Sequence, residues 1–166
     1  TDLLVQLKQG HLAPKVLIDL KKIRGLSGIR FEKSTGLHIG ALTTVAEIES
    51  SKIIRVQSPV LFQAAGLLGS VQVRNKATIG GNICRAAPSG DLIPPLLVLN
   101  SKVIIKSING ERVVDLEDFF LGSGKTTLKK NEILTEILVP PPKVAGDGVY
   151  IKHGRRKSMD LAVVGV

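Results

Sequence analysis

Apolar residues in the first part of the chain recur at two spacings, one typical of helices and one typical of strands. Leu3, Leu4 and Leu7 follow a helical spacing, and Gly10 is a suitable stop for that helix. The apolar run at residues 16–18 predicts a short buried strand. The chain therefore opens with a helix that leads into a strand.

A hairpin and two capped helices are predicted next. Residues 29–31 and 37–39 lie on either side of a Ser-Thr-Gly turn, which predicts a β-hairpin. Thr44 and Glu47 have the spacing of a capping box, so a short helix is expected to begin there. Ser58, followed by a proline, begins a second helix that continues to Leu68.

The rest of the chain combines short helices and strands. Residues 70–91 are rich in glycine, asparagine and small side chains, show no helical period, and give no sign of a helix beginning at their glycines. The later segments predict a helix at residues 92–99, a hairpin of residues 103–106 and 112–114 around Asn109-Gly110, a helical turn at 116–120, and strands at 133–139 and 161–166. This order lacks a regular βαβ alternation, so it favours an α+β fold over a doubly wound one.

The length of 166 residues suits one domain with a real core, and we expect residues 1–166 to form it. Residues 140–148 are the only candidate linker, and they are too few to separate independent domains. The chain begins at Thr1 without a methionine and ends within a predicted strand, so we interpret it as a fragment.

The net charge of +9 is compatible with an acidic partner or a phosphate-bearing ligand, although the basic residues are dispersed along the chain. Aromatic residues make up only 3%, which argues against a single-strand nucleic-acid binder, because such proteins need stacking platforms. We therefore expect no nucleic-acid partner.

Cysteine and histidine usage excludes several kinds of site. Cys84 is the only cysteine, so the chain can form no internal disulfide and holds no Cys-x-x-Cys pair for zinc or an iron–sulfur cluster; this fits a cytoplasmic location. His11, His38 and His153 are isolated in sequence and are interpreted as structural or surface residues. No apolar run approaches 18 residues, so no membrane span is expected.

Residues 122–127 are similar to the end of a nucleotide-binding P-loop. That motif requires a glycine where this chain has Phe119, and it requires a strand before it and a helix after it. Neither element is predicted there. The segment is therefore interpreted as a surface connection.

The segment that begins at Thr78 is more informative. Gly80 and Gly81 would let the backbone approach a ligand and leave N–H groups free for anionic oxygens, while Asn82 adds a short polar side chain. Asp91 could accept hydrogen bonds from ligand hydroxyls. From the residues alone, a phosphate or dinucleotide loop and a plain glycine-rich bend remain equally open.

Residues 73–84, continuing through residues 87–92, resemble the signature of the FAD-binding medium subunit of molybdenum hydroxylases. This family includes carbon monoxide dehydrogenase, xanthine dehydrogenase and aldehyde oxidoreductases. Residues 1–3 resemble the end of the family's first flavin loop, and residues 37–44, 120–122, 132–134 and 150–152 are also similar.

The resemblance implies an α+β, vanillyl-alcohol-oxidase-type (PCMH-type) FAD-binding fold of two lobes with FAD between them, without the first glycine loop and the C-terminal flavoprotein domain. It also implies a role for several groups of residues. Those expected at the pyrophosphate and ribityl part are Thr1, Asp2, Leu3, Thr78, Gly80, Gly81 and Asn82, with Asp91 on a sugar hydroxyl. Those expected elsewhere along the cofactor are Cys84 and Arg85, Leu68 and Gly69 at the adenosine half, and Leu134 and Lys152 near the isoalloxazine.

The function implied by the resemblance is electron transfer through FAD within an oxidoreductase complex. An iron–sulfur small subunit with 2Fe-2S clusters would deliver electrons from a large subunit that holds the molybdenum cofactor, and NAD, a quinone or another acceptor would receive them. No catalytic residue or metal ligand is assigned to this chain. The alternatives are a stand-alone flavin reductase of the same fold and a non-enzymatic basic binding module.

Overall fold

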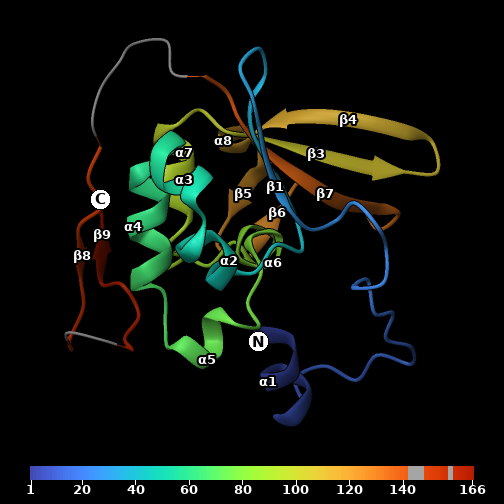
Figure 1. Cartoon of the computed structure of the whole chain (residues 1–166). Helices are drawn as coiled ribbons and strands as arrows, with labels where there is room; N and C mark the ends of the chain where they lie inside the picture. Colours follow the sequence, from blue (N-terminus) through green and yellow to red (C-terminus); the bar gives the residue numbers. More distant parts are fainter. Residues whose placement is uncertain (142–147, 157–158) are drawn as a thin grey trace.

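The computed structural model describes residues 1–141, 148–156 and 159–166 (Figure 1). The helices are α1 (Asp2–Lys8), α2 (Val45–Ser50), α3 (Lys52–Gln57), α4 (Pro59–Leu67), α5 (Val71–Arg74), α6 (Ile79–Arg85), α7 (Ile93–Val98) and α8 (Leu116–Phe119). The strands are β1 (Ile29–Glu32), β2 (Gly36–Gly40), β3 (Lys102–Ser107), β4 (Gly110–Asp115), β5 (Phe120–Gly122), β6 (Lys125–Thr126), β7 (Glu132–Val139), β8 (Lys152–His153) and β9 (Val164–Gly165).

The main sheet has five strands in the order β1-β2-β7-β3-β4, and all its neighbours are antiparallel. The two predicted hairpins, β1–β2 and β3–β4, lie on either side of β7, which joins them. The helices and the antiparallel sheet occupy separate layers (Figure 1). This is the α+β arrangement that the sequence predicted.

The core lies between one face of this sheet and the helices. Ile39, Ile137 and Val103 are register partners across β2, β7 and β3, and all three are fully buried. They belong to one cluster with buried side chains of the helices, among them Leu61 of α4 and Leu96 of α7. In β3, Val103 and Ile105 are buried while Ile104 between them is only partly buried, because one face of the strand meets the helices.

The helix starts that depend on local side chains were predicted correctly. Thr44 accepts a hydrogen bond from the Glu47 amide (3.2 Å), and Glu47 accepts one from the Thr44 amide (2.7 Å), which completes the capping box. α4 begins at Pro59 after Ser58, as predicted. The helix α3 between them was not predicted, and Ser51 caps its N-terminus.

The predicted buried strand at residues 16–18 is wrong. These residues form no strand, and Val16, Leu17 and Ile18 are 73%, 60% and 80% exposed. Apolar character alone suggested the strand, but no other described segment pairs with it. The helix α1 was predicted correctly, with Gly10 at φ +74° just after its end, although none of its residues is buried.

The prediction that residues 70–91 contain no helix is also wrong. α5 and α6 both lie in this segment, and hydroxyls of Ser70 and Thr78 cap their N-termini. Glycine disfavours helix interiors by roughly 1 kcal/mol relative to alanine. Here the tertiary contacts described below hold the glycine-rich turn in a helical conformation.

The P-loop-like segment and the C-terminal segment form two small sheets. β5 and β6 pair across an exposed turn, so the segment is a surface hairpin; a strand precedes it, contrary to expectation, but no helix follows it. Of the strand predicted at residues 161–166, only β9 is regular, and it pairs with β8. Most of the linker predicted at residues 140–148 lies outside the described residues. No helix in the described part of the chain has both the length and the apolar character needed to cross a membrane.

Candidate functional site

The predicted phosphate segment is the first turn of α6. Thr78 is its N-cap, and its Oγ1 accepts a hydrogen bond from the Gly81 amide at 3.1 Å. The amides of Ile79 and Gly80 donate to the carbonyls of Thr43 (3.0 Å) and Ala41 (2.9 Å). The expectation that the glycine amides are free for anionic oxygens is therefore wrong, because the turn before α2 and the cap already use them.

The two glycines of this turn differ in what surrounds them. A Cβ on Gly80 would lie 2.7 Å from both the Cβ and the carbonyl oxygen of Ala41, so Gly80 allows α6 to pack tightly on the turn before α2. Gly81 is exposed, and its Cβ would meet only Thr78 Oγ1, at 2.9 Å. Gly81 is thus the part of the turn that a ligand can approach from solvent.

Asn82 and Cys84 extend the site along α6. Asn82 Oδ1 is buried without a hydrogen-bond partner among the described residues, and a Cβ on Gly90 would lie 3.4 Å from it. Burial raises the pKa of the Cys84 thiol to about 11, so the thiol stays protonated at neutral pH. Asn82 therefore offers an unused acceptor, whereas Cys84 offers only a neutral contact.

An ion pair joins the N-terminal residues to the end of α6. Arg85 Nε lies 2.6 Å from Asp2 Oδ2, and both side chains are about half exposed, at 48% and 50%. The predicted contacts Thr1, Asp2 and Leu3 are therefore brought to the same place as α6, although an exposed pair of this kind stabilises by less than about 1 kcal/mol.

Asp91 belongs to a buried polar cluster with Tyr150 and Lys152. Its carboxylate accepts a hydrogen bond from the Tyr150 hydroxyl (3.0 Å) and one from the Lys152 ammonium (2.9 Å), which also donates to the Leu67 carbonyl (3.1 Å). Burial and the neighbouring Asp91 carboxylate raise the pKa of the Tyr150 hydroxyl, so it remains a donor. Sequence reasoning grouped Asp91 and Lys152 with the cofactor but assigned no role to Tyr150.

The remaining predicted contacts lie at the end of α4 and in β7. Leu68 is the C-cap of α4 and is buried, and Gly69 follows at φ +52°. Leu134 is 5% exposed in β7, a strand that contacts α6, and it belongs to the core cluster. Core packing thus accounts for Leu134, whose contact with the cofactor stays a prediction.

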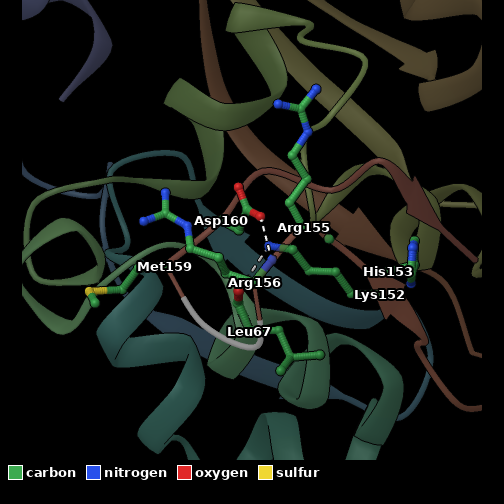
Figure 2. Close-up of a pocket in the computed structure, with 8 residues that line it drawn as sticks. Leu67, Lys152, His153, Arg155, Arg156, Met159 and Asp160 are labelled. Atoms are coloured by element: carbon green, nitrogen blue, oxygen red, sulfur yellow. Dashed lines mark hydrogen bonds between the residues drawn. The ribbon is translucent and has the colours of Figure 1, made fainter.

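A cavity of about 270 Å³ adjoins the Asp91 cluster (Figure 2). Its lining is Leu67, Lys152, His153, Gly154, Arg155, Arg156, Met159 and Asp160. The Asp160 carboxylate accepts hydrogen bonds from the amides of Arg156 (2.8 Å) and Leu161 (2.9 Å), and these bonds lower its pKa against the opposing effect of burial. Three of the eight lining residues, Lys152, Arg155 and Arg156, carry positive charge, and Asp160 carries negative charge.

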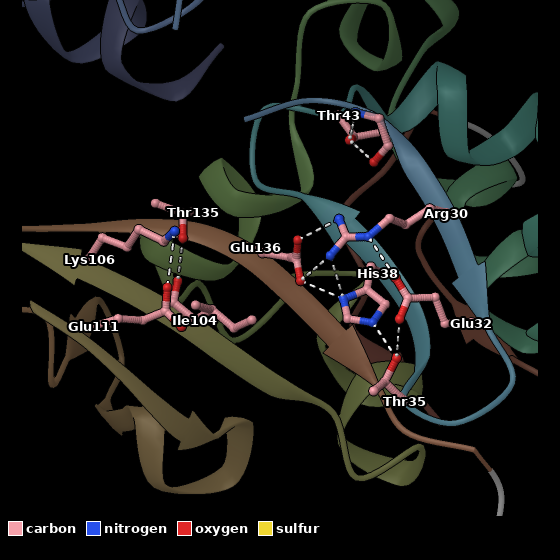
Figure 3. A network of polar contacts seen from close by, with 11 residues as sticks. Arg30, Glu32, Thr35, His38, Thr43, Ile104, Lys106, Glu111, Thr135 and Glu136 are labelled. Carbon is pink, nitrogen blue, oxygen red and sulfur yellow. Dashed lines mark hydrogen bonds and ion pairs between the residues drawn. The ribbon is translucent and has the colours of Figure 1, made fainter. Parts of the chain in front are cut away.

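A second polar network, partly buried, lies on the sheet and involves none of the predicted site residues (Figure 3). His38 Nδ1 lies 2.6 Å from Glu136 Oε1, and Arg30 donates to the other oxygen of that carboxylate at 2.8 Å. Burial opposes ionisation of Glu136, but the hydrogen bonds from His38 and Arg30 outweigh it and lower the pKa of this carboxyl. His38 joins β2 to β7, which confirms its interpretation as a structural residue.

Solved structures share this fold over nearly the whole chain. Carbon monoxide dehydrogenase from Hydrogenophaga pseudoflava, in a form that lacks the Mo-pyranopterin moiety, aligns with a TM-score of 0.92 and 39% identity over 99% of this chain and 56% of that chain. Quinoline 2-oxidoreductase from Pseudomonas putida 86 aligns with a TM-score of 0.91 and 26% identity, again over 99% and 56%. These likenesses confirm the predicted class, an α+β FAD-binding fold of the PCMH type.

Sequence comparisons narrow this class to one family. Residues 1–142 match the model of the FAD binding domain in molybdopterin dehydrogenase. The nicotinate dehydrogenase FAD-subunit of Eubacterium barkeri is 37% identical over 99% of this chain and 56% of its own length. The carbon monoxide dehydrogenase medium chain of Hydrogenophaga pseudoflava is 37% identical over 98% and 56%. The chain belongs to the family of FAD-binding domains of molybdopterin dehydrogenases, and it spans a little over half the length of these relatives.

The residues present fit a dinucleotide cofactor. Gly81 is exposed at a helix start, Asn82 holds a buried acceptor without a partner among the described residues, and Arg85 and Lys152 lie in ion pairs with Asp2 and Asp91. The adjacency of Asn82 to Gly90 connects α6 to the Asp91 cluster. The predicted contacts thus form two groups, one on α6 with Asp2 at its end and one of Asp91 and Lys152 next to the end of α4.

Proposed function

We propose that this chain is the FAD-binding part of the electron-transferring subunit of a molybdenum-containing hydroxylase. The observation that carries the proposal is the family match over residues 1–142, which includes the α6 turn with Gly81 and Asn82. Bound FAD would supply the exchange between one-electron and two-electron carriers. The substrate of the whole enzyme would be oxidised on another subunit.

The residues of this chain would bind and orient the cofactor. Thr78, Gly81 and Asn82 would lie along the pyrophosphate and ribityl part, where Gly81 leaves room for a close approach and Asn82 Oδ1 accepts from a hydroxyl. Asp91 already accepts two hydrogen bonds from Tyr150 and Lys152, so its carboxylate would reach a sugar hydroxyl with its remaining lone pairs.

The partners proposed are an iron–sulfur small subunit and a molybdenum large subunit, with NAD, a quinone or another acceptor receiving the electrons in a cytoplasmic location. Names such as "medium chain" and "FAD-subunit" among the relatives support a multi-subunit assembly. The charge of +9 would favour docking to less basic subunits. We expect assembly with these subunits to weaken as the salt concentration rises. Assembly that does not depend on the salt concentration would contradict an electrostatic contribution to docking.

The visible absorbance of the chain after incubation with FAD and desalting tests the proposal. A retained flavin band is expected, both here and in a longer chain that carries the flanking regions of the relatives. The band should be lost or weakened in Gly81→Ala, whose methyl group would lie 2.9 Å from Thr78 Oγ1 at the exposed start of α6, while the unfolding midpoint should change less than in Gly80→Ala. If neither this chain nor the longer chain retains flavin, the proposed FAD-binding function is wrong and the basic binding module is favoured.

A further inference from the structure

Arg74 connects three segments through one largely buried side chain. Its Nε donates to Glu49 Oε2 of α2 at 2.6 Å, and its Nη1 lies 3.1 Å from the Leu68 carbonyl oxygen and 3.4 Å from that of Gly69. The Arg74 side chain is 12% exposed. A guanidinium presents several donors in a fixed planar fork, so it can hold a carboxylate and two carbonyls at once, whereas an ammonium cannot reproduce that geometry.

The connection held by Arg74 is the turn between α4 and α5. Leu68 ends α4, and Gly69 has a left-handed conformation at φ +52°, so the carbonyls of this turn have no partner within a helix. A Cβ on Gly69 would lie 3.2 Å from the Val73 side chain, which leaves the turn little room to shift toward α5. Arg74 thus provides the hydrogen bonds that fix this turn.

The same side chain links the turn to the α6 site. Glu49 lies in α2, and the residues just before α2 hold the start of α6: Thr44 forms a β-bridge with Thr78, and the Val45 amide donates to the Ala77 carbonyl at 2.9 Å. Arg74 therefore ties the Leu68–Gly69 turn to the helix that also positions Thr78.

We propose that Arg74 is a positioning residue for the adenosine half of the cofactor. This rests on the proposed function and on the contacts with that half that the family resemblance implies for Leu68 and Gly69. Arg74 acts through these two residues and does not itself touch the ligand. Its removal should therefore weaken contacts made by the adenosine end and leave those made by the isoalloxazine end unchanged.

Separate titrations of the full chain with FAD and FMN test the inference, because FMN lacks the adenosine phosphate. Arg74→Met should raise the FAD dissociation constant about tenfold and change the FMN constant by less than about twofold. Arg74→Lys keeps the charge but not the fork, so it should not restore FAD binding. Glu49→Gln removes only the charge of one partner and should move FAD binding in the same direction by about threefold, which provides a milder variant if Arg74→Met does not fold.

Arg112→Met is a matched control. Arg112 donates to the Glu132 carboxylate (2.9 Å) and to the Thr127 carbonyl (3.1 Å), so it also joins a carboxylate to a backbone oxygen, but it lies on β4. Its loss should leave the ratio of FAD to FMN affinity unchanged.

Three results would overturn the inference. If Arg74→Met binds FAD as tightly as the wild type, Arg74 does not position the turn. If FAD and FMN weaken equally, Arg74 only supports the fold. If the wild-type chain binds neither nucleotide, the proposed function fails and the role of Arg74 fails with it, an outcome visible before any variant is compared.

Discussion

Replacement of Lys152 by methionine tests how strongly the buried Asp91 cluster stabilises the fold. The side chains of Lys152 and Asp91 are 10% and 6% exposed, so little water can replace the lost contact. Removal of one partner from a buried ion pair costs roughly 3–5 kcal/mol, because the other charge stays buried without compensation. Tyr150 still donates to Asp91 in this variant, so we expect the lower end, about 3 kcal/mol.

The assay is urea unfolding followed by far-ultraviolet circular dichroism, without added flavin, with the free energy extrapolated linearly to water. The double variant Lys152→Met/Asp91→Asn removes both charges and should recover most of the lost free energy. Lys102→Met is the control: Lys102 lies 2.6 Å from Asp115, but these side chains are 40% and 57% exposed, so its loss should cost less than about 1 kcal/mol.

Two results would refute this reasoning. A loss in Lys152→Met no larger than that in Lys102→Met would show that the buried pair is solvated or is not formed. A double variant as unstable as the single one would show that the loss comes from packing rather than from an unpaired carboxylate. Either result would also remove the physical basis for treating Lys152 and Asp91 as one unit.

Three further predictions concern single side chains. Gly80→Ala should lower the free energy of unfolding by about 1–3 kcal/mol through backbone overlap, whereas Gly81→Ala should change it little; equal losses in urea unfolding would contradict the packing difference. Hydrogen bonds from Arg112 and a backbone amide lower the pKa of Glu132 to about 2 from 4.5. The stabilising effect of the Glu132 carboxylate is therefore complete above pH 4.5 and is lost as the pH falls through 2. The difference in urea midpoint between the wild type and Glu132→Gln should shrink over that window, and a constant difference would contradict this prediction. Because burial raises the pKa of the Cys84 thiol to about 11, alkylation by iodoacetamide at pH 8 should be slow in the folded chain and rapid in urea, and equal rates would contradict the burial.

Elements that depend on neighbouring residues could be predicted from the sequence. The Thr44–Glu47 capping box, the proline after Ser58 and the two hairpin turns are local signals, and each marks an element that the structure contains. The turn of the second hairpin lies one residue earlier than expected, since Ser107 pairs with Gly110. Such signals fix where an element begins because the partner atoms are three or four residues away.

The predictions that failed depended on partners far away in the chain. α6 is helical although Gly80 and Gly81 lie in its first turn, because the carbonyls of Thr43 and Ala41 accept hydrogen bonds from the amides of Ile79 and Gly80. The fully occupied amides of this turn were missed for the same reason. A useful signal was nevertheless present, since Thr78 lies three residues before Gly81 as an N-cap hydroxyl would.

The role of Tyr150 could not have been found by spacing. It meets Asp91 across 59 residues, and a Cβ on Gly165 would lie 2.6 Å from its hydroxyl, so the contact also requires a glycine on β9. The family resemblance implied Asp91 at a sugar hydroxyl and Lys152 near the isoalloxazine, so their direct contact at 2.9 Å was not predicted. The contacts of the predicted residues with FAD remain predictions.

The position of β7 has a consequence for the order in which the chain can fold. Each outer hairpin pairs residues close in sequence, but the β2–β7 ladder joins Leu37 to Val139, and no other strand of the sheet connects the two hairpins. Local hairpins form within microseconds, whereas contacts between distant residues set the slow step of folding. During synthesis, the β1–β2 hairpin would therefore leave the ribosome long before its partner, with one strand edge open to wrong pairing. Insertion of β7 between the hairpins closes the sheet, and we expect this event to limit the folding rate.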